Sequence, residues 1–157
     1  MKIVIDSNIL FSALIKDSIT RRIILDYEDQ FLFPSYIFEE MEKHKNELLT
    51  KSKMKSRDFE DLLVLLLRIV IIIPKEVLLH YKNEAYQIIK DIDPDDVIFI
   101  ACALAYSDSI IWSDDKNLKQ QSKVKIINTN EMYSLLYSKK IDEKINLGSA
   151  EFFLNRY

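Results

Sequence analysis

Short apolar runs alternate with amphipathic stretches along most of the chain. Runs rich in β-branched residues predict strands, and these runs occupy residues 2–5, 31–33, 70–73, 110–112 and 124–127. Apolar residues spaced three and four apart predict helices over residues 7–14, 18–28, 35–50, 56–67, 77–81, 84–90, 97–106 and 128–137. Short buried strands joined by helical crossovers predict an α/β protein: a three-layer α/β/α sandwich with a central parallel sheet.

The ends of these elements carry their own signals. Ser35 is placed to cap the helix that follows Pro34, and either Asn128 or Thr129 is placed to cap the last helix. We expect one domain over residues 1–138, because no linker composition or internal repeat divides it. Residues 139–157 then form a C-terminal tail that packs on the domain or on a partner, and its aromatic end suggests a dimer surface.

Acidic residues stand where the predicted sheet should present them together. Asp6 directly follows the first strand, and Asp114 and Asp115 follow the fourth. Asp96 begins an almost wholly apolar helix, and Glu40 lies nearly two turns into its helix on a polar face. In parallel α/β sheets the functional crevice lies beyond the carboxyl ends of the strands. These carboxylates are therefore expected to converge on one cleft.

Converging carboxylates without basic partners predict a bound cation, because like charges held close must otherwise keep a proton. Oxygen-only ligands suit Mg²⁺ or Mn²⁺, and such ions activate water for attack on a phosphodiester. Each acid also has an ordinary interpretation. Asp95 or Asp96 can cap a helix, Glu40 can be a solvated residue, and Asp114 or Asp115 can belong to a turn. Asp6 is the hardest to explain in that way, because it closes a buried strand.

The composition of the chain limits its expected cellular location and the way it could bind nucleic acid. The chain has 157 residues, a single cysteine, no zinc-site spacing and a net charge of −3. We expect a cytoplasmic protein without a membrane segment that does not coat nucleic acid by bulk attraction. Local basic residues must then contact any RNA phosphates. The best candidates are Arg21, Arg22, Lys43, Lys45, Lys51, Lys53 and Lys55. His44 and His80 are interpreted as surface or structural residues, and Cys102 as a core residue.

Four segments, in order, resemble the motifs of the PIN-domain family, which includes VapC-type toxin ribonucleases. The first is Ile5-Asp-Ser-Asn-Ile-Leu-Phe-Ser-Ala-Leu14, and the second is Tyr36-Ile-Phe-Glu-Glu-Met-Glu-Lys-His44. The third is Asp93-Pro-Asp-Asp-Val-Ile-Phe-Ile-Ala-Cys-Ala-Leu104, and the fourth is Ile111-Trp-Ser-Asp-Asp-Lys-Asn-Leu118. The resemblance covers roughly residues 2–137 and implies a PIN-like sandwich.

The resemblance also implies an activity, namely Mg²⁺- or Mn²⁺-dependent endonucleolytic cleavage of RNA. It implies that the catalytic and metal-binding residues are Asp6, Glu40, Asp96 and Asp115. Supporting residues around them would be Asn8, Ser113, Asp93 and Asp114. The partners it implies are an RNA substrate, a small antitoxin protein and a second copy of the chain. The doubled acids at Asp95/Asp96 and Asp114/Asp115 leave the coordinating member of each pair open.

Three other classes of protein share features with this pattern. A response-regulator receiver needs a phosphate-accepting Asp after a middle strand and a Lys after a late one, and neither is well placed here. A phosphatase of the haloacid type needs a second Asp two residues after the first, where this chain has Asn8. A PIN fold used as a non-catalytic RNA- or protein-binding module stays open, because intact ligands do not prove turnover.

Overall fold

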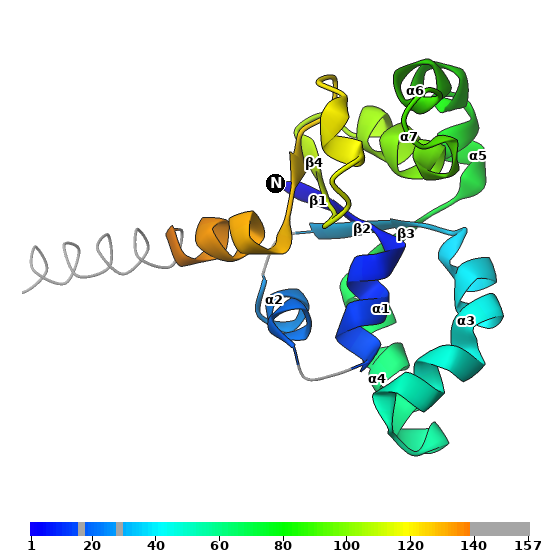
Figure 1. Cartoon of the computed structure of the whole chain (residues 1–157), viewed down its shortest axis with the longest axis vertical. Coiled ribbons are helices and arrows are strands. Elements are labelled where there is room, and N and C mark those ends of the chain that lie inside the picture. Colours follow the sequence, from blue (N-terminus) through cyan, green and yellow to red (C-terminus); the bar gives the residue numbers. More distant parts are fainter. Residues whose placement is uncertain (16–17, 28–29, 139–157) are drawn as a thin grey trace, which may run out of the picture.

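The computed structural model describes residues 1–15, 18–27 and 30–138, and Figure 1 shows the arrangement of its elements. Its strands are β1 (Lys2–Ile5), β2 (Gln30–Pro34), β3 (Val70–Ile73), β4 (Ser109–Trp112) and β5 (Ile126–Ile127). They form one five-stranded sheet in the order β3-β2-β1-β4-β5. Every pair of neighbours is parallel, and Lys2 on β1 lies in register with Gln30 on β2 and Ser109 on β4. The predicted parallel sheet is confirmed.

Helices cover both faces of this sheet. On one face lie α1 (Ser7–Ile15), α2 (Ile19–Asp26), α3 (Ile37–Ser52) and α4 (Ser56–Ile69) (Figure 1). On the other face lie α5 (Lys75–Leu79), α6 (Lys82–Ile89) and α7 (Val97–Ala105). The 3₁₀ turns η1 (Pro94–Asp96) and η2 (Leu118–Gln120) precede α7 and β5, and residues 129–138 form a last helical segment. This is the expected α/β/α sandwich.

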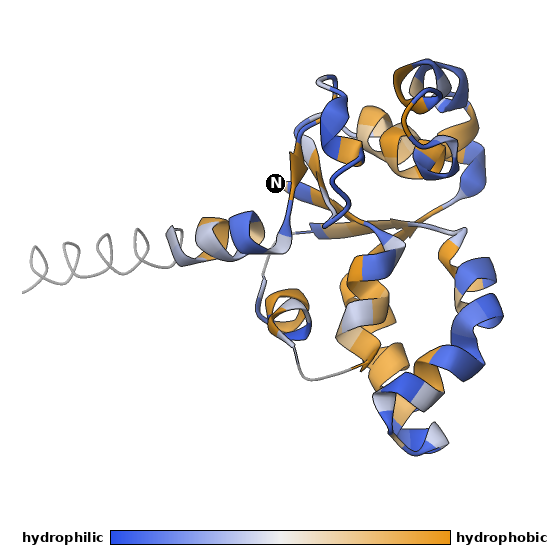
Figure 2. Ribbon diagram, in the orientation of Figure 1, coloured by the Kyte–Doolittle hydropathy of each residue, from blue (hydrophilic) through white to orange (hydrophobic). Residues whose placement is uncertain are grey.

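The core follows from a sheet that is covered on both sides. Consecutive residues of β1 are buried, because each pleat of a central parallel strand meets a helix layer. Trp112 on β4 is fully buried, with its ring 6.2 Å from that of Phe31 on β2. Phe33 of β2 meets Phe99 of α7 edge-on at 6.1 Å. Figure 2 shows the apolar residues gathered along the strands and α1. The strands are thus packed against both helix layers, and this packing fixes the positions of their ends.

Several predicted element ends differ from the structure by about two residues, and two of these differences follow from particular hydrogen bonds. Ser35 does not cap the helix after Pro34, because its backbone N–H still pairs with the carbonyl of Ile73 at 2.9 Å, and α3 begins only at Ile37. The last strand is shorter than expected. The side-chain amide of Gln121 donates to the carbonyl of Val124 at 2.8 Å and accepts from its N–H at 2.9 Å, so Val124 has no need of a ladder partner.

The last helix begins with a capping box. Asn128 accepts a hydrogen bond from the N–H of Glu131 at 2.9 Å, and Glu131 accepts one from the N–H of Asn128 at 2.7 Å. Asn128 is therefore the cap among the two predicted candidates. The predicted tail, residues 139–157, and the predicted end of the second helix at Glu28 lie outside the described residues. No helix in the described part of the chain is both long enough and apolar enough to cross a membrane.

Candidate metal centre

The centre lies where the chain order of the sheet reverses. β1 stands between β2 and β4, so the crossovers from β1 and from β4 leave in opposite directions. In this architecture ligands bind at such a switch point, beyond the carboxyl ends of the strands. Asp6 leaves β1 there, with its N–H donating to the carbonyl of Trp112 at 3.1 Å, and Ser113 leaves β4 beside it. Strand pairing alone brings these two residues together.

A buried hydroxyl joins the two strand ends. Asp6 is only 4% exposed, and its Oδ2 accepts a hydrogen bond of 2.6 Å from Oγ of Ser113. The same Oγ accepts from the N–H of Asp115 at 3.0 Å, and Oδ1 of Asp6 accepts from the N–H of Asn8 at 3.2 Å. Burial raises the pKa of Asp6, Asp115 and Asp114 add to that rise, and the two hydrogen bonds oppose it.

Three further carboxylates gather next to Asp6. One oxygen from each of Asp93, Asp96 and Asp115 lies within 4.8 Å of the others. Burial and the neighbouring acids, with Asp6 first among them, raise the pKa of Asp96 to about 7. The sequence predicts only a supporting position for Asp93, whereas the structure places it directly in the cluster. Asp93 and Asp96 both belong to the turn around Pro94. This Asp-Pro turn is the sequence signal that could have placed Asp93 in the cluster.

Hydrogen bonds separate the two members of each aspartate pair. Asp114 points away from the cluster, because its two oxygens accept from the N–H and the hydroxyl of Thr129, each at 2.7 Å. Asp115 stays in the cluster. At the other pair Asp96 belongs to the cluster, while Asp95 is exposed and its N–H donates to Oδ1 of Asp93 at 3.2 Å.

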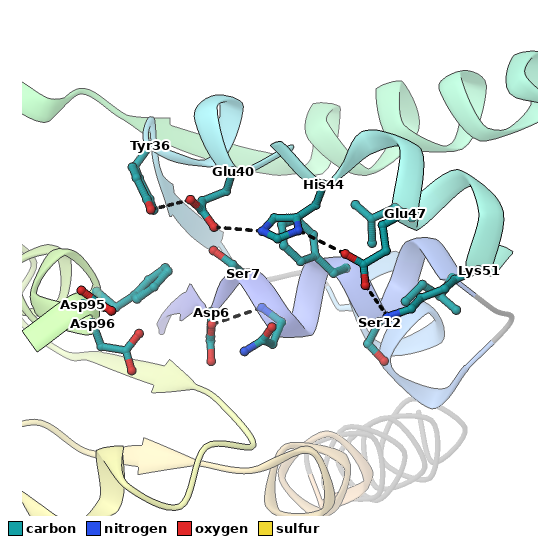
Figure 3. Close-up of a pocket in the computed structure, with 15 residues that line it drawn as sticks. Asp6, Ser7, Ser12, Tyr36, Glu40, His44, Glu47, Lys51, Asp95 and Asp96 are labelled. Atoms are coloured by element: carbon teal, nitrogen blue, oxygen red, sulfur yellow. Dashed lines mark hydrogen bonds and ion pairs between the residues drawn. The ribbon is translucent and has the colours of Figure 1, made fainter. Parts of the chain in front are cut away.

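Glu40 lies across the cleft from Asp6 and Asp96, as Figure 3 shows. Its Oε1 accepts hydrogen bonds from the hydroxyl of Tyr36 at 2.5 Å and from Nζ of Lys43 at 3.0 Å, and Nε2 of His44 lies 3.7 Å from its Oε2. The Tyr36 hydroxyl is the largest cause that lowers the pKa of Glu40, and the same contact raises the pKa of Tyr36 to about 12. The structure therefore places Glu40 at the cleft but outside the three-oxygen group.

The cleft has a volume of about 550 Å³ and runs between α1 and α3. One wall is a polar row along α3 that continues past Glu40 to His44, Glu47 and Lys51 (Figure 3). His44 contacts the ring of Phe11 from α1 at 5.7 Å between centroids. The sequence predicts a surface position for His44, and its side chain is 42% exposed; its spacing of four from Glu40 places it on the helix face that lines the cleft.

Four of the predicted RNA-contacting residues, namely Arg21, Arg22, Lys43 and Lys45, already have partners. Arg21 donates from Nε to the carbonyl of Ala13 at 2.7 Å, which satisfies the end of α1. Lys43 is paired with Glu40, and Lys45 lies 3.6 Å from Glu60. Arg22 is exposed on α2 and is engaged elsewhere. The structure does not bring these four residues together at the acidic cluster.

The donor set fits a hard divalent cation. Carboxylate oxygens from separate elements face one another, which Mg²⁺ and Mn²⁺ prefer over nitrogen or sulfur ligands. Among the described residues, no lysine or arginine forms an ion pair with Asp6, Asp93, Asp96 or Asp115. A cation would remove the repulsion that raises the pKa of Asp96.

Sheet and cluster together define an α/β/α protein with an oxygen-rich acidic centre at its switch point. The chain belongs to the PIN domain family, whose model matches residues 4–137. The fold is also similar to a chain in the crystal structure of VapBC2 from Rickettsia felis bound to a DNA fragment from their promoter. That similarity has a TM-score of 0.60 and 19% identity, and covers 82% of this chain and 98% of that one. No curated protein matches the sequence significantly.

Proposed function

We propose that this protein is a divalent-metal-dependent endoribonuclease and the toxin of a toxin-antitoxin pair. One observation carries the proposal: the oxygens of Asp93, Asp96 and Asp115 lie within 4.8 Å of one another, beside a buried Asp6 and with no lysine or arginine paired to them among the residues that the structure describes. Such a group is suited to bind a hard cation, and it lies at the carboxyl edge of the sheet, where this architecture binds its ligands. Membership of the PIN domain family supports the nuclease class.

The residues of the proposed site have different roles. Asp6, Asp96 and Asp115, with Asp93, would hold Mg²⁺ or Mn²⁺. When bound there, such an ion would lower the pKa of the attacking water and neutralise charge at the phosphate. Ser113 fixes the Asp6 carboxylate through its 2.6 Å hydrogen bond. Glu40 accepts a proton from, or orients, water on the opposite wall of the cleft, where the hydroxyl of Tyr36 holds its Oε1.

The partners follow from this function. RNA is the substrate, and a small antitoxin protein and a second copy of the chain are the protein partners. Support for an antitoxin comes from the similar fold in VapBC2, a complex whose crystal structure includes promoter DNA. The cleft offers such a partner a polar wall on α3 and an apolar contact at Phe11.

Cleavage of single-stranded RNA in the presence of Mn²⁺ tests the proposal. Asp6→Asn should lower the rate by at least about 100-fold, because a neutral amide at the buried position weakens the metal site. Asp26→Asn, on an exposed residue at the end of α2, is the matched control and should cleave as wild type does. Equal cleavage by wild type and Asp6→Asn would contradict the proposed site. Absence of cleavage by folded wild type would favour a non-catalytic binding module.

A further inference from the structure

A second cavity adjoins the acidic cleft. It has a volume of about 370 Å³ and is lined from α5 and α7 by apolar side chains that include Leu79, Val97 and Ile98. Tyr36 and Asp95 line this cavity and also the acidic cleft. A flexible ligand can therefore pass from one to the other. Leu79 is 60% exposed, so the apolar wall is open to solvent.

Two cations flank this cavity. Lys75 and Lys82 line it from the starts of α5 and α6, and both are exposed. Within the described ranges neither lysine forms an ion pair or a side-chain hydrogen bond. Lys43, Lys45 and Lys51 differ, because each is paired with a glutamate of its own layer. Among the described residues that line the cavity, Asp95 is the one carboxylate, so the two ammonium groups exceed it and make a locally positive site for an anion in a chain of net charge −3.

We propose that this cavity binds a nucleotide of single-stranded RNA next to the scissile phosphate, an inference that rests on the proposed nuclease function. An apolar wall and an aromatic edge accept an unstacked base. Lysine ammonium groups accept phosphates as point charges. Because Tyr36 and Asp95 border both cavities, the neighbouring phosphate of the same strand reaches the cluster of Asp93, Asp96 and Asp115.

Charge favours RNA over an apolar peptide as the occupant. An apolar peptide would use the wall formed by Leu79 and Val97 but would leave Lys75 and Lys82 without counter-charges. A polynucleotide supplies a phosphate at every residue together with a flat base, and thus matches both features of the cavity. A protein partner remains an outcome that the experiment distinguishes.

The test is the binding of a fluorescent single-stranded RNA, followed by anisotropy in Ca²⁺ at several salt concentrations. Lys75→Ala/Lys82→Ala should weaken binding roughly tenfold and reduce the steepness of the salt dependence, by about 0.7 in log–log slope for each lost contact. Lys90→Ala/Lys123→Ala removes the same charge from exposed positions that do not line the cavity, and should bind as wild type does. Leu79→Asp should weaken binding without changing the lysines.

The outcomes separate this inference from the proposed function. Loss of binding with the Lys75/Lys82 pair and not with the control pair supports the cavity, whether or not wild type cleaves RNA. Unchanged affinity and salt slope in that variant overturn it, even if Mn²⁺-dependent cleavage by wild type is intact, and point to a protein occupant. Absence of RNA binding by folded wild type also overturns it. Thermal melting of each variant shows that the fold is retained.

Discussion

At the scale of single residues, hydrogen bonds decide which carboxylates are available to a cation. Asp114 and Asp115 are neighbours in the chain, yet Thr129 engages both side-chain oxygens of Asp114. Asp115 uses Oδ1 to accept from the N–H of Asn117 at 2.8 Å and still belongs to the three-oxygen group. Local sequence treats the two acids alike. Their roles diverge because only one of them reaches the last helix.

This division predicts opposite effects for matched substitutions. Asp115→Asn should lower Mn²⁺-dependent RNA cleavage by about 10- to 100-fold with little change in stability. Asp114→Asn should keep most of the activity and lower the free energy of unfolding by about 1 kcal/mol, because it weakens the contacts to Thr129. Cleavage rates and urea denaturation of both variants check this. A reversed pattern would place Asp114, not Asp115, in the metal centre.

At the scale of elements, helix ends account for several side chains that suggested function in the sequence. Arg21 belongs to α2, and its side chain extends to the end of α1. There it donates to the carbonyls of Ala13 and Leu14 at 2.7 and 3.5 Å. A cation at a helix C-terminus satisfies unpaired carbonyls and complements the helix dipole. Since α1 carries Asn8 and the residues that line one wall of the cleft, Arg21 serves the site through its support of that helix.

We therefore expect Arg21→Ala to act on stability and not on RNA affinity. The free energy of unfolding should fall by about 1–2 kcal/mol, as for other hydrogen bonds made by charged groups. The salt dependence of RNA binding should stay that of wild type, since the guanidinium already has partners. Denaturation and anisotropy titrations measure the two effects. A flatter salt dependence in this variant would return Arg21 to the RNA interface.

At the scale of the whole molecule, the acidic centre couples stability to pH and to metal. The pKa of Asp96 is raised from 3.8 to about 7 in the folded chain. Between these values the folded state holds a proton that the unfolded state has released, so the free energy of unfolding falls as pH rises through this window. The raised pKa of Asp6 acts in the same direction. The pKa values of Glu40, Glu47 and Glu131 are lowered, chiefly by hydrogen bonds from Tyr36, Lys51 and Lys119, so these three groups contribute stability that is lost as the pH falls and act in the opposite direction.

We predict that the pH dependence of the free energy of unfolding changes sign when a divalent cation is added. Without metal, wild type should be less stable at about pH 8 than at about pH 5, and Asp96→Asn should remove about 1 kcal/mol of that difference, because solvent screens this partly exposed carboxyl group. With excess Mn²⁺, wild type should gain stability as pH rises, because cations bind the deprotonated carboxylates. Urea denaturation at both pH values, with EDTA or Mn²⁺, measures this. Identical pH dependence of the metal-free wild type and Asp96→Asn would show that Asp96 is not under electrostatic strain.

The sequence pattern is enough to predict the layers, the strands and the acidic residue types. Apolar periodicity encodes burial directly, and a residue that follows a buried parallel strand, such as Asp6 or Ser113, must lie at the sheet edge. The folded chain, in contrast, places Asp93 in the cluster, brings Asp115 rather than Asp114 to it, and supplies the partners of Arg21 and Lys45. These depend on contacts between segments distant in the chain, such as Asp114 with Thr129. Local periodicity carries no information about such contacts.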